Sequence, residues 1–270
     1  TCRRRMVQRP DRLAAPRVPG TPQSALACAW DYRDPSGWRI LATPMPEDAA
    51  RMDDAQAAAP TSPISLAAEQ SWEAAATILF PVLRPAGTPG LHLDTIVTPA
   101  SAAGNIDPLL DRGPVDLEIA YAMTAEGFDV LANGDHLAAW GVSPATLRQA
   151  AFRNLEAWAA AASWSIDDAG RRRVISSDTG DGWDASRILL PETIAHLADT
   201  LGGPGDRVLL GLPARHLLIA GTLHGDDPEF APLFADFVLE YAGDSDESID
   251  RRVFELREGQ VTLFDPSAPA

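Results

Sequence analysis

Residues 205–241 read GDRVLLGLPARHLLIAGTLHGDDPEFAPLFADFVLEY. This segment predicts two almost wholly apolar strands, Val208 to Leu212 and Leu217 to Leu223, which are joined by a tight connection. From Phe230 to Tyr241, apolar residues recur at intervals of three and four, as they do on one face of a helix. Strands that are apolar on both faces belong in the middle of a sheet, so we expect this stretch to form the core.

Strand and helix patterns also follow one another in the rest of the chain. Alternating apolar residues from Val115 to Met123, a turn, and Phe128 predict a β-hairpin. Further strands are predicted within residues 25–46, 91–98, 164–166, 172–176, 188–190, 253–256 and 261–264, and further helices within residues 66–80, 135–141, 143–162 and 192–201. Together these elements favour an α+β fold with a mainly antiparallel or mixed sheet flanked by helices.

Changes in composition suggest where the chain divides. Residues 1–22 combine Arg and Pro without periodicity, so we expect a disordered basic tail there. Pro, Gly, Ser and Asn cluster in residues 99–114, which predicts a linker loop between two parts. The expected parts are a smaller N-terminal α+β part at 23–98, a larger C-terminal α+β part at 115–265 and a short tail at 266–270.

The charge of the chain is unevenly distributed. The 270 residues carry a formal net charge of −16, but residues 1–22 hold six arginines and one acidic residue. Residues 23–270 therefore carry a net charge of −21. An acidic body of this kind is repelled by nucleic-acid phosphates and by anionic lipid, which argues against nucleic-acid and membrane-surface binding and favours basic or neutral partners.

Cysteine content and hydropathy indicate the compartment. Cys2 and Cys28 are the two cysteines, and their spacing predicts neither a disulfide framework nor a thiolate zinc site. Apolar runs fall far short of the roughly 20 residues that a membrane helix needs, and the Arg-rich start lacks the apolar centre of a signal peptide. We therefore expect a cytoplasmic protein without a cofactor.

Three segments carry a resemblance to a known family: LEIAYAMTAEGFDVLANGDHLAAWGVSPATLRQAAFRNLEAW, GWDASRILLPETI and GDRVLLGLPARHLLIAG. Over roughly residues 113–265 the chain resembles the uncharacterised bacterial family called domain of unknown function 1444. The family has no established activity, so the resemblance implies a fold and not a function. Its strand connection usually reads Pro-x-Arg-Asp, which Pro213 and Arg215 match. This chain departs from that pattern at His216, which cannot lock the turn by pairing its charge with Arg215.

Recognition residues are expected in the segments that resemble the family. Trp and Arg are frequent anchors of interfaces, and an Arg between two buried strands needs an acceptor nearby. The alternative is that these arginines are tied to backbone carbonyls or carboxylates within the fold. The binding candidates are Trp183, Asp184, Arg187, Arg215 and His216.

One local group of residues mixes imidazole and carboxylate. His224, Asp226 and Asp227 follow the second central strand, and His216 precedes it. Sites often lie at strand ends, so these residues are weak candidates for a metal or catalytic site. Their spacing matches no metal motif, and the alternative is that an aspartate caps the following helix.

Other motifs are better explained by structure than by chemistry. The run Gly141 to Ala145 nearly matches the GxSxG nucleophile elbow, but Pro144 after Ser143 is typical of a helix cap. The acidic loops at 178–184 and 244–250 lack the ligand order of an EF-hand, so we expect solvated turns. His92 and Asp94 would share one face of a strand, but no nucleophile can be assigned to them.

Two hypotheses about function follow from these patterns. In the first, the chain is a non-enzymatic module that binds another protein or a small ligand, because no catalytic arrangement is evident. In the second, it is a metal-dependent hydrolase or transferase that uses His216, His224, Asp226 and Asp227. The oligomeric state cannot be predicted from the sequence.

Overall fold

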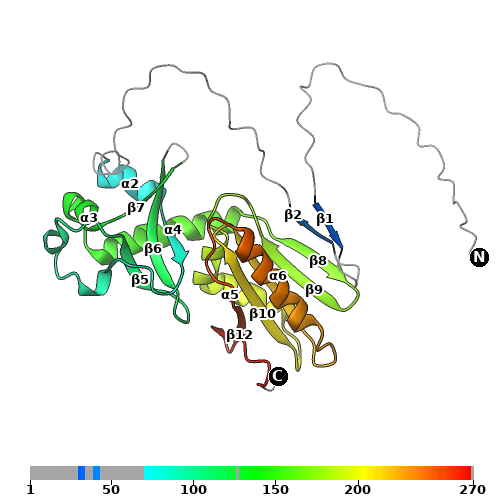
Figure 1. The fold of residues 1–270 in the computed structure, drawn as a ribbon. Helices are drawn as coiled ribbons and strands as arrows, with labels where there is room; N and C mark the ends of the chain where they lie inside the picture. The colour runs from blue at the N-terminus through cyan, green and yellow to red at the C-terminus, as the bar shows by residue number, and fades with distance from the viewer. Residues whose placement is uncertain (1–29, 34–38, 43–69, 126–127, 269–270) are drawn as a thin grey trace, which may run out of the picture. The chain divides into compact units, whose positions relative to one another are not determined.

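The computed structural model describes residues 70–125 and 128–268, together with the backbone of two short strands upstream (Figure 1). These strands, β1 (Trp30–Arg33) and β2 (Arg39–Ala42), form an antiparallel pair within the unit Thr1–Gln56, as the sequence predicts. The other described elements belong to a second unit, Ala57–Ala270. The predicted basic tail and the first residues of the helix predicted from Leu66 lie outside the described residues.

The second unit is built on an antiparallel six-stranded sheet in the order β13-β12-β10-β11-β9-β8. The two strands predicted from residues 205–241 lie at its centre as β10 (Arg207–Ala214) and β11 (Leu217–Leu223), and every residue in both is buried. The outer strands are β8 (Ser165–Ala169), β9 (Arg172–Ser177), β12 (Val253–Arg257) and β13 (Gln260–Leu263). The prediction of a central strand pair is confirmed.

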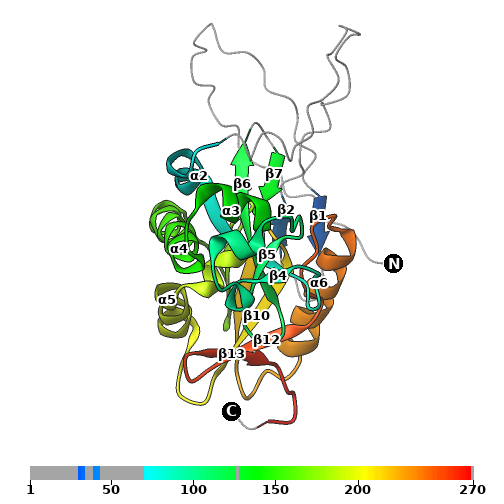
Figure 2. The same ribbon diagram turned by 90° about the vertical axis from the view of Figure 1, so that its left-hand side faces the viewer.

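Alternating side chains give the central strands two apolar faces. Leu209 and Ile219 point to the face that packs against α6 (Phe230–Asp244). Leu210 and Ala220 point to the opposite face, where the main core includes residues of α5 (Pro191–Leu201). Figure 2 shows α5 and α6 on opposite sides of β10. Residues buried on both faces explain why these strands lack the polar alternation of a surface strand.

Helix α6 lies close to the sheet because Gly211 has no side chain. A Cβ atom at this position would lie 2.5 Å from Val238 Cγ2 and 2.9 Å from Ile219 Cγ2. We expect Gly211→Ala to lower the free energy of unfolding by roughly 1–3 kcal/mol through overpacking, as measured by urea denaturation. Gly225→Ala is the control, because a Cβ there meets no atom within 4 Å. Equal stability of the two variants would contradict this close packing.

A second sheet is formed by β3 (Leu79–Arg84), β6 (Glu118–Ala125), β5 (Leu109–Arg112) and β4 (Leu91–His92), with β7 (Phe128–Leu131) also paired to β6. The β4–β5 pair is parallel and the others are antiparallel, so this sheet is mixed. The helices that accompany it are α2 (Trp72–Ile78), α3 (Gly134–Trp140) and α4 (Pro144–Ala161). The chain thus has the predicted α+β fold.

The predicted division at residues 99–114 is not seen in the structure. Strand β5 lies within this stretch and pairs with β6, while its neighbour β4 belongs to the part predicted as N-terminal. Strands β3 and β4 therefore share a sheet with β6, which follows the predicted linker. The Pro and Gly residues mark turns inside one sheet, including the short 3₁₀ helix η2 (Pro99–Ala102), and do not separate two domains.

Three local predictions differ from the structure. The strand predicted at 91–98 ends at His92, because Thr95 Oγ1 donates to the carbonyl of His92 and the chain turns into the 3₁₀ helix η1 (Leu93–Thr95). The strand predicted at 188–190 belongs instead mainly to the 3₁₀ helix η3 (Ala185–Leu189). The helix predicted within residues 66–80 ends at Ile78, and its last two predicted residues belong to β3.

Other predicted element ends match closely. Ser143 caps α4 and accepts a hydrogen bond from the backbone of Thr146, as expected for a cap followed by proline. The helix predicted within residues 135–141 is α3, which begins at Gly134 and is capped by Asn133. Within the described part of the chain, no helix has the length and apolar character needed to cross a membrane.

Candidate functional site

Asp184 lies in the interior, at the end of the loop that follows β9. Its side chain is 0% exposed and accepts hydrogen bonds from Ser177 Oγ at 2.6 Å, Thr179 Oγ1 at 3.0 Å and the Thr179 backbone at 3.1 Å. A buried carboxylate needs such donors to offset the loss of water. Asp184 therefore fixes the loop, and it has no exposed face to offer a partner.

Arg187 ties η3 to the C-terminal end of α4. Its guanidinium, 3% exposed as a residue, donates to the carbonyls of Ala159, Ala162 and Ser163 at 3.1, 3.4 and 3.2 Å. The last carbonyls of a helix find no N–H donor within the helix, so a side-chain donor can satisfy them. A cation at this end also interacts favourably with the helix dipole. Arg187 therefore acts as a C-terminal cap for α4.

The environment of Arg187 is both aromatic and polar. Its Cζ atom lies 3.8 Å from the ring centroid of Trp164 and 5.7 Å from that of Trp158. Ser177 Oγ accepts from Arg187 at 2.8 Å and donates to Asp184, so one hydroxyl links the two charges. Burial lowers the pKa of Arg187, and the charge of Asp184 opposes that shift.

Trp183 and Arg215 belong to a neighbouring buried cluster. Trp183 stacks on Phe80 at a centroid distance of 4.5 Å, and the guanidinium of Arg215 lies 4.7 Å above the indole. Arg215 also donates to the carbonyl of Gly182 and pairs with Asp129 and with Glu247. The turn between β10 and β11 is therefore held by acids from elsewhere in the chain.

His216 contacts a tyrosine of α6. Its Nε2 lies 2.9 Å from the hydroxyl of Tyr241. Burial, together with the charges of Asp178 and Asp184, raises the pKa of Tyr241 to about 12, so the phenol stays protonated at neutral pH. His216 thus points toward α6. Among the described residues it shares no hydrogen bond with the other predicted recognition residues.

The weak metal candidates are held by separate partners. His224 contacts Asp206 through Nδ1 and the carbonyl of Arg171 through Nε2, each at 2.8 Å, and the bond to Asp206 is the main cause of its raised pKa. Asp226 pairs with Arg171, and Asp227 pairs with Arg172 at 2.6 Å. These arginines hold the pKa of both aspartates below the usual range. Across the described residues, no group of three or more His, Cys, Asp or Glu could hold a metal ion.

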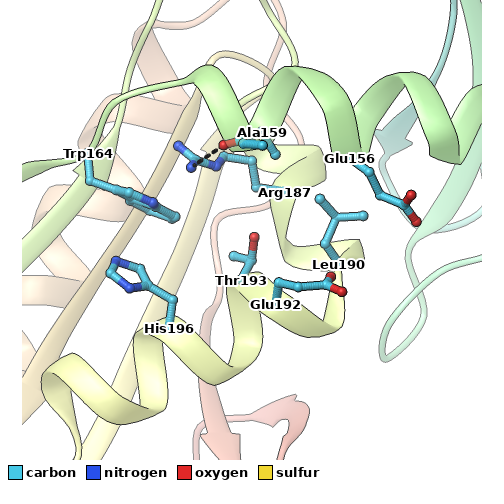
Figure 3. Close-up of a pocket in the computed structure, with 9 residues that line it drawn as sticks. Glu156, Ala159, Trp164, Arg187, Leu190, Glu192, Thr193 and His196 are labelled. Carbon is cyan, nitrogen blue, oxygen red and sulfur yellow. Dashed lines mark hydrogen bonds between the residues drawn. The ribbon is translucent and has the colours of Figure 1, made fainter.

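A pocket of about 350 Å³ opens where α4, η3 and α5 meet (Figure 3). This volume falls within the range of small-molecule sites. Of the predicted candidates, only Arg187 lines it. The lining residues are Glu156, Ala159, Ala160, Trp164, Arg187, Leu190, Glu192, Thr193 and His196.

The inner part of the pocket holds polar groups without partners. Thr193 is 5% exposed, and its hydroxyl makes no hydrogen bond within the described part of the chain. Arg187 Nε and His196 Nε2 are buried and likewise have no hydrogen-bond partner there. In Figure 3 the indole of Trp164 lies between Arg187 and His196, while the Thr193 hydroxyl points from α5 toward Arg187. Such groups carry a free-energy cost that a bound molecule can offset.

The outer part of the pocket is acidic. Glu156 of α4 and Glu192 of α5 are exposed and come from the two sides of the opening, with Leu190 between them (Figure 3). The arrangement therefore combines buried donors, an apolar middle and carboxylates at the surface. Pockets of this composition bind small molecules by shape and a few directed hydrogen bonds.

Most residues that line the pocket are not among the candidates predicted from the sequence. Thr193 and His196 are three residues apart, and Glu192 and His196 are four apart, so the predicted helix at 192–201 already placed them on one face. Leu197 and Leu201 of the same helix are buried, so the polar face opposite a buried face was the feature of the sequence that could have indicated a site. Nothing in the sequence showed that this face meets α4.

No match to this chain was found among protein-family models, curated proteins or solved structures.

Proposed function

We propose that the chain is a cytoplasmic, non-enzymatic module that binds a small ligand in the pocket between α4, η3 and α5. The observation that supports this most strongly is that two buried nitrogens without hydrogen-bond partners among the described residues, Arg187 Nε and His196 Nε2, belong to residues that line a pocket of about 350 Å³. Native proteins pair nearly all buried polar groups, and the exceptions are often found at functional sites.

Two further features support a ligand in this place. The cap that Arg187 provides to α4 and the stacking of Trp164 on that guanidinium hold the inner wall of the pocket rigid. A pocket formed before the ligand arrives costs less ordering entropy on binding. All lining residues also fall within residues 113–265, where we propose that the chain shares the fold of the family it resembles.

The protein-binding form of this hypothesis has less support. Trp183, Asp184, Arg187 and Arg215, which were expected to anchor an interface, are buried and engaged within the fold. The hydrolase or transferase hypothesis has no support from the observed contacts. It would use His216, His224, Asp226 and Asp227, and each of these four residues contacts a different partner. Ligand binding at the pocket is therefore the function we put forward.

A blocked pocket tests this proposal. Ala160 lines the pocket and is exposed on α4, so we expect Ala160→Trp to fill the opening without disturbing the core. A mixture of small fragments is screened by ligand-observed NMR against the unmodified chain and this variant. The expected result is that a set of fragments binds the unmodified chain and loses at least about tenfold in affinity with Ala160→Trp.

The control is Ala157→Trp, which adds the same bulk at an exposed position of α4 outside the pocket. It should bind the same fragments as the unmodified chain. If fragments bind all three proteins equally, or none binds the unmodified chain, the proposed function is contradicted.

A further inference from the structure

We infer that the pocket recognises a zwitterion, a molecule with an anionic acceptor group at its inner end and an ammonium group at its outer end. This inference rests on the proposed function and adds to it the chemical class of the ligand. It follows from the opposite character of the two ends of the pocket.

The inner end offers donors and positive charge. The Thr193 hydroxyl can donate to an acceptor, and the guanidinium of Arg187 lies on the same side of the pocket (Figure 3). Four hydrogen bonds from this guanidinium go to three backbone carbonyls and to Ser177 Oγ, none of which carries a negative charge. Its charge is balanced only at a distance, by Asp184 through Ser177. A carboxylate beside Thr193 would bring the negative charge closer.

The start of α5 reinforces this preference. Helix α5 begins at Pro191, which has no N–H, and the N–H of Thr193 donates to the carbonyl of Leu190. The N-terminal end of a helix nevertheless carries a partial positive charge. Leu190, Glu192 and Thr193 of this first turn all line the pocket. The partial charge of the helix end and the unpartnered hydroxyl of Thr193 therefore favour the same anionic group.

The outer end requires the opposite charge. Glu156 and Glu192 stand on α4 and α5 at the opening, and among the described residues neither has an ion pair with a basic side chain. An anion alone would have to pass these two carboxylates to reach Thr193, and a cation alone would leave the inner donors unpaired. A zwitterion with an apolar middle beside Leu190 satisfies both ends at once.

Probes of matched length test this inference. We would titrate 4-aminobutanoate, 6-aminohexanoate and 8-aminooctanoate into the protein, each beside the simple carboxylate and the simple alkylammonium of the same carbon number, and record dissociation constants by ligand-observed NMR. The expected result is that one of the amino acids binds at least about tenfold more tightly than the carboxylate and the ammonium of its own length. Equal binding by any one of these singly charged probes would overturn the inference.

Two variants separate the contributions of the two ends. Thr193→Val keeps the shape of the side chain and removes the hydroxyl. It should therefore weaken binding of the amino acid and of the carboxylate but not binding of the ammonium. The double variant Glu156→Gln and Glu192→Gln should weaken binding of the amino acid and of the ammonium but not binding of the carboxylate. If either variant weakens all three probes equally, the assignment of the two ends is overturned.

The outcome also distinguishes this inference from the proposed function. If other fragments bind the unmodified chain and lose affinity in the Ala160→Trp variant while no amino-acid probe binds, the pocket is a ligand site and the zwitterion inference fails. If no compound of any kind is sensitive to Ala160→Trp, the proposed function and the inference both fail.

Discussion

Replacing Arg187 with methionine is expected to lower the free energy of unfolding by about 3–5 kcal/mol. Methionine keeps most of the side-chain length and removes the guanidinium. The carbonyls of Ala159, Ala162 and Ser163 then lose their donor at the end of α4. These three hydrogen bonds are part-buried, so the larger share of the expected loss falls on the buried Ser177 and Asp184, which lose their hydrogen-bonded link to the guanidinium.

Urea denaturation followed by circular dichroism measures this loss. Arg153→Met is the matched control, because Arg153 is an exposed residue of the same helix. We expect the control to change stability by no more than about 0.5 kcal/mol. A loss of similar size in both variants would mean that the α4 carbonyls are solvated without Arg187, and would contradict its role as a cap.

Arg207→Met is expected to have a similarly large effect, through a buried ion pair. Arg207 of β10 binds Glu255 of β12 with two hydrogen bonds of 2.9 and 2.6 Å, and their side chains are 8% and 5% exposed. Arg207 also donates to the carbonyls of Asp265 and Ala268, which holds the C-terminal segment against the sheet. Removing the arginine leaves the buried carboxylate of Glu255 with the longer ion pair to the exposed Arg257, at 3.8 Å, and we expect a cost of about 3 kcal/mol.

A second substitution distinguishes the cost of an unpaired charge from a general loss of packing. In the double variant Arg207→Met and Glu255→Met, neither charge remains, so we expect it to be more stable than Arg207→Met alone. Denaturation midpoints of both single variants and the double variant complete the cycle. A double variant that is less stable than Arg207→Met alone would contradict the view that the weakly paired carboxylate of Glu255 causes the loss.

The central strands and their helix could be predicted because local pattern and burial agree there. Apart from Thr222, whose hydroxyl donates to the carbonyl of Leu201, Val208 to Leu212 and Leu217 to Leu223 have no polar side chain facing either core, so tertiary packing had no reason to override the pattern. The predicted strand at 188–190 failed for the opposite reason. Its apolar run packs as part of η3, where Arg187 donates its backbone N–H to the carbonyl of Asp184 and closes a 3₁₀ turn.

The candidate site depends on contacts that no local pattern reveals. Glu156 lies on α4 and His196 on α5, and β8, β9 and η3 separate these helices in the chain. Arg187 was identified as a candidate from its residue type, but its role as the cap of α4 depends on carbonyls in a distant segment. The expected exposure of Trp183 and Arg215 was also overridden by packing, because stacking on Phe80 and pairing with Asp129 draw them into the interior.

The most direct test of the ligand site is its location by NMR. A fragment that binds the unmodified chain is titrated into isotopically labelled protein, and the signals of the Trp164 indole, the Thr193 backbone and the His196 imidazole are followed. The proposal predicts that these signals shift while those of Trp183 and His216, which do not line the pocket, stay in place. Shifts centred on Trp183 and His216 would contradict it and would place the binding site elsewhere.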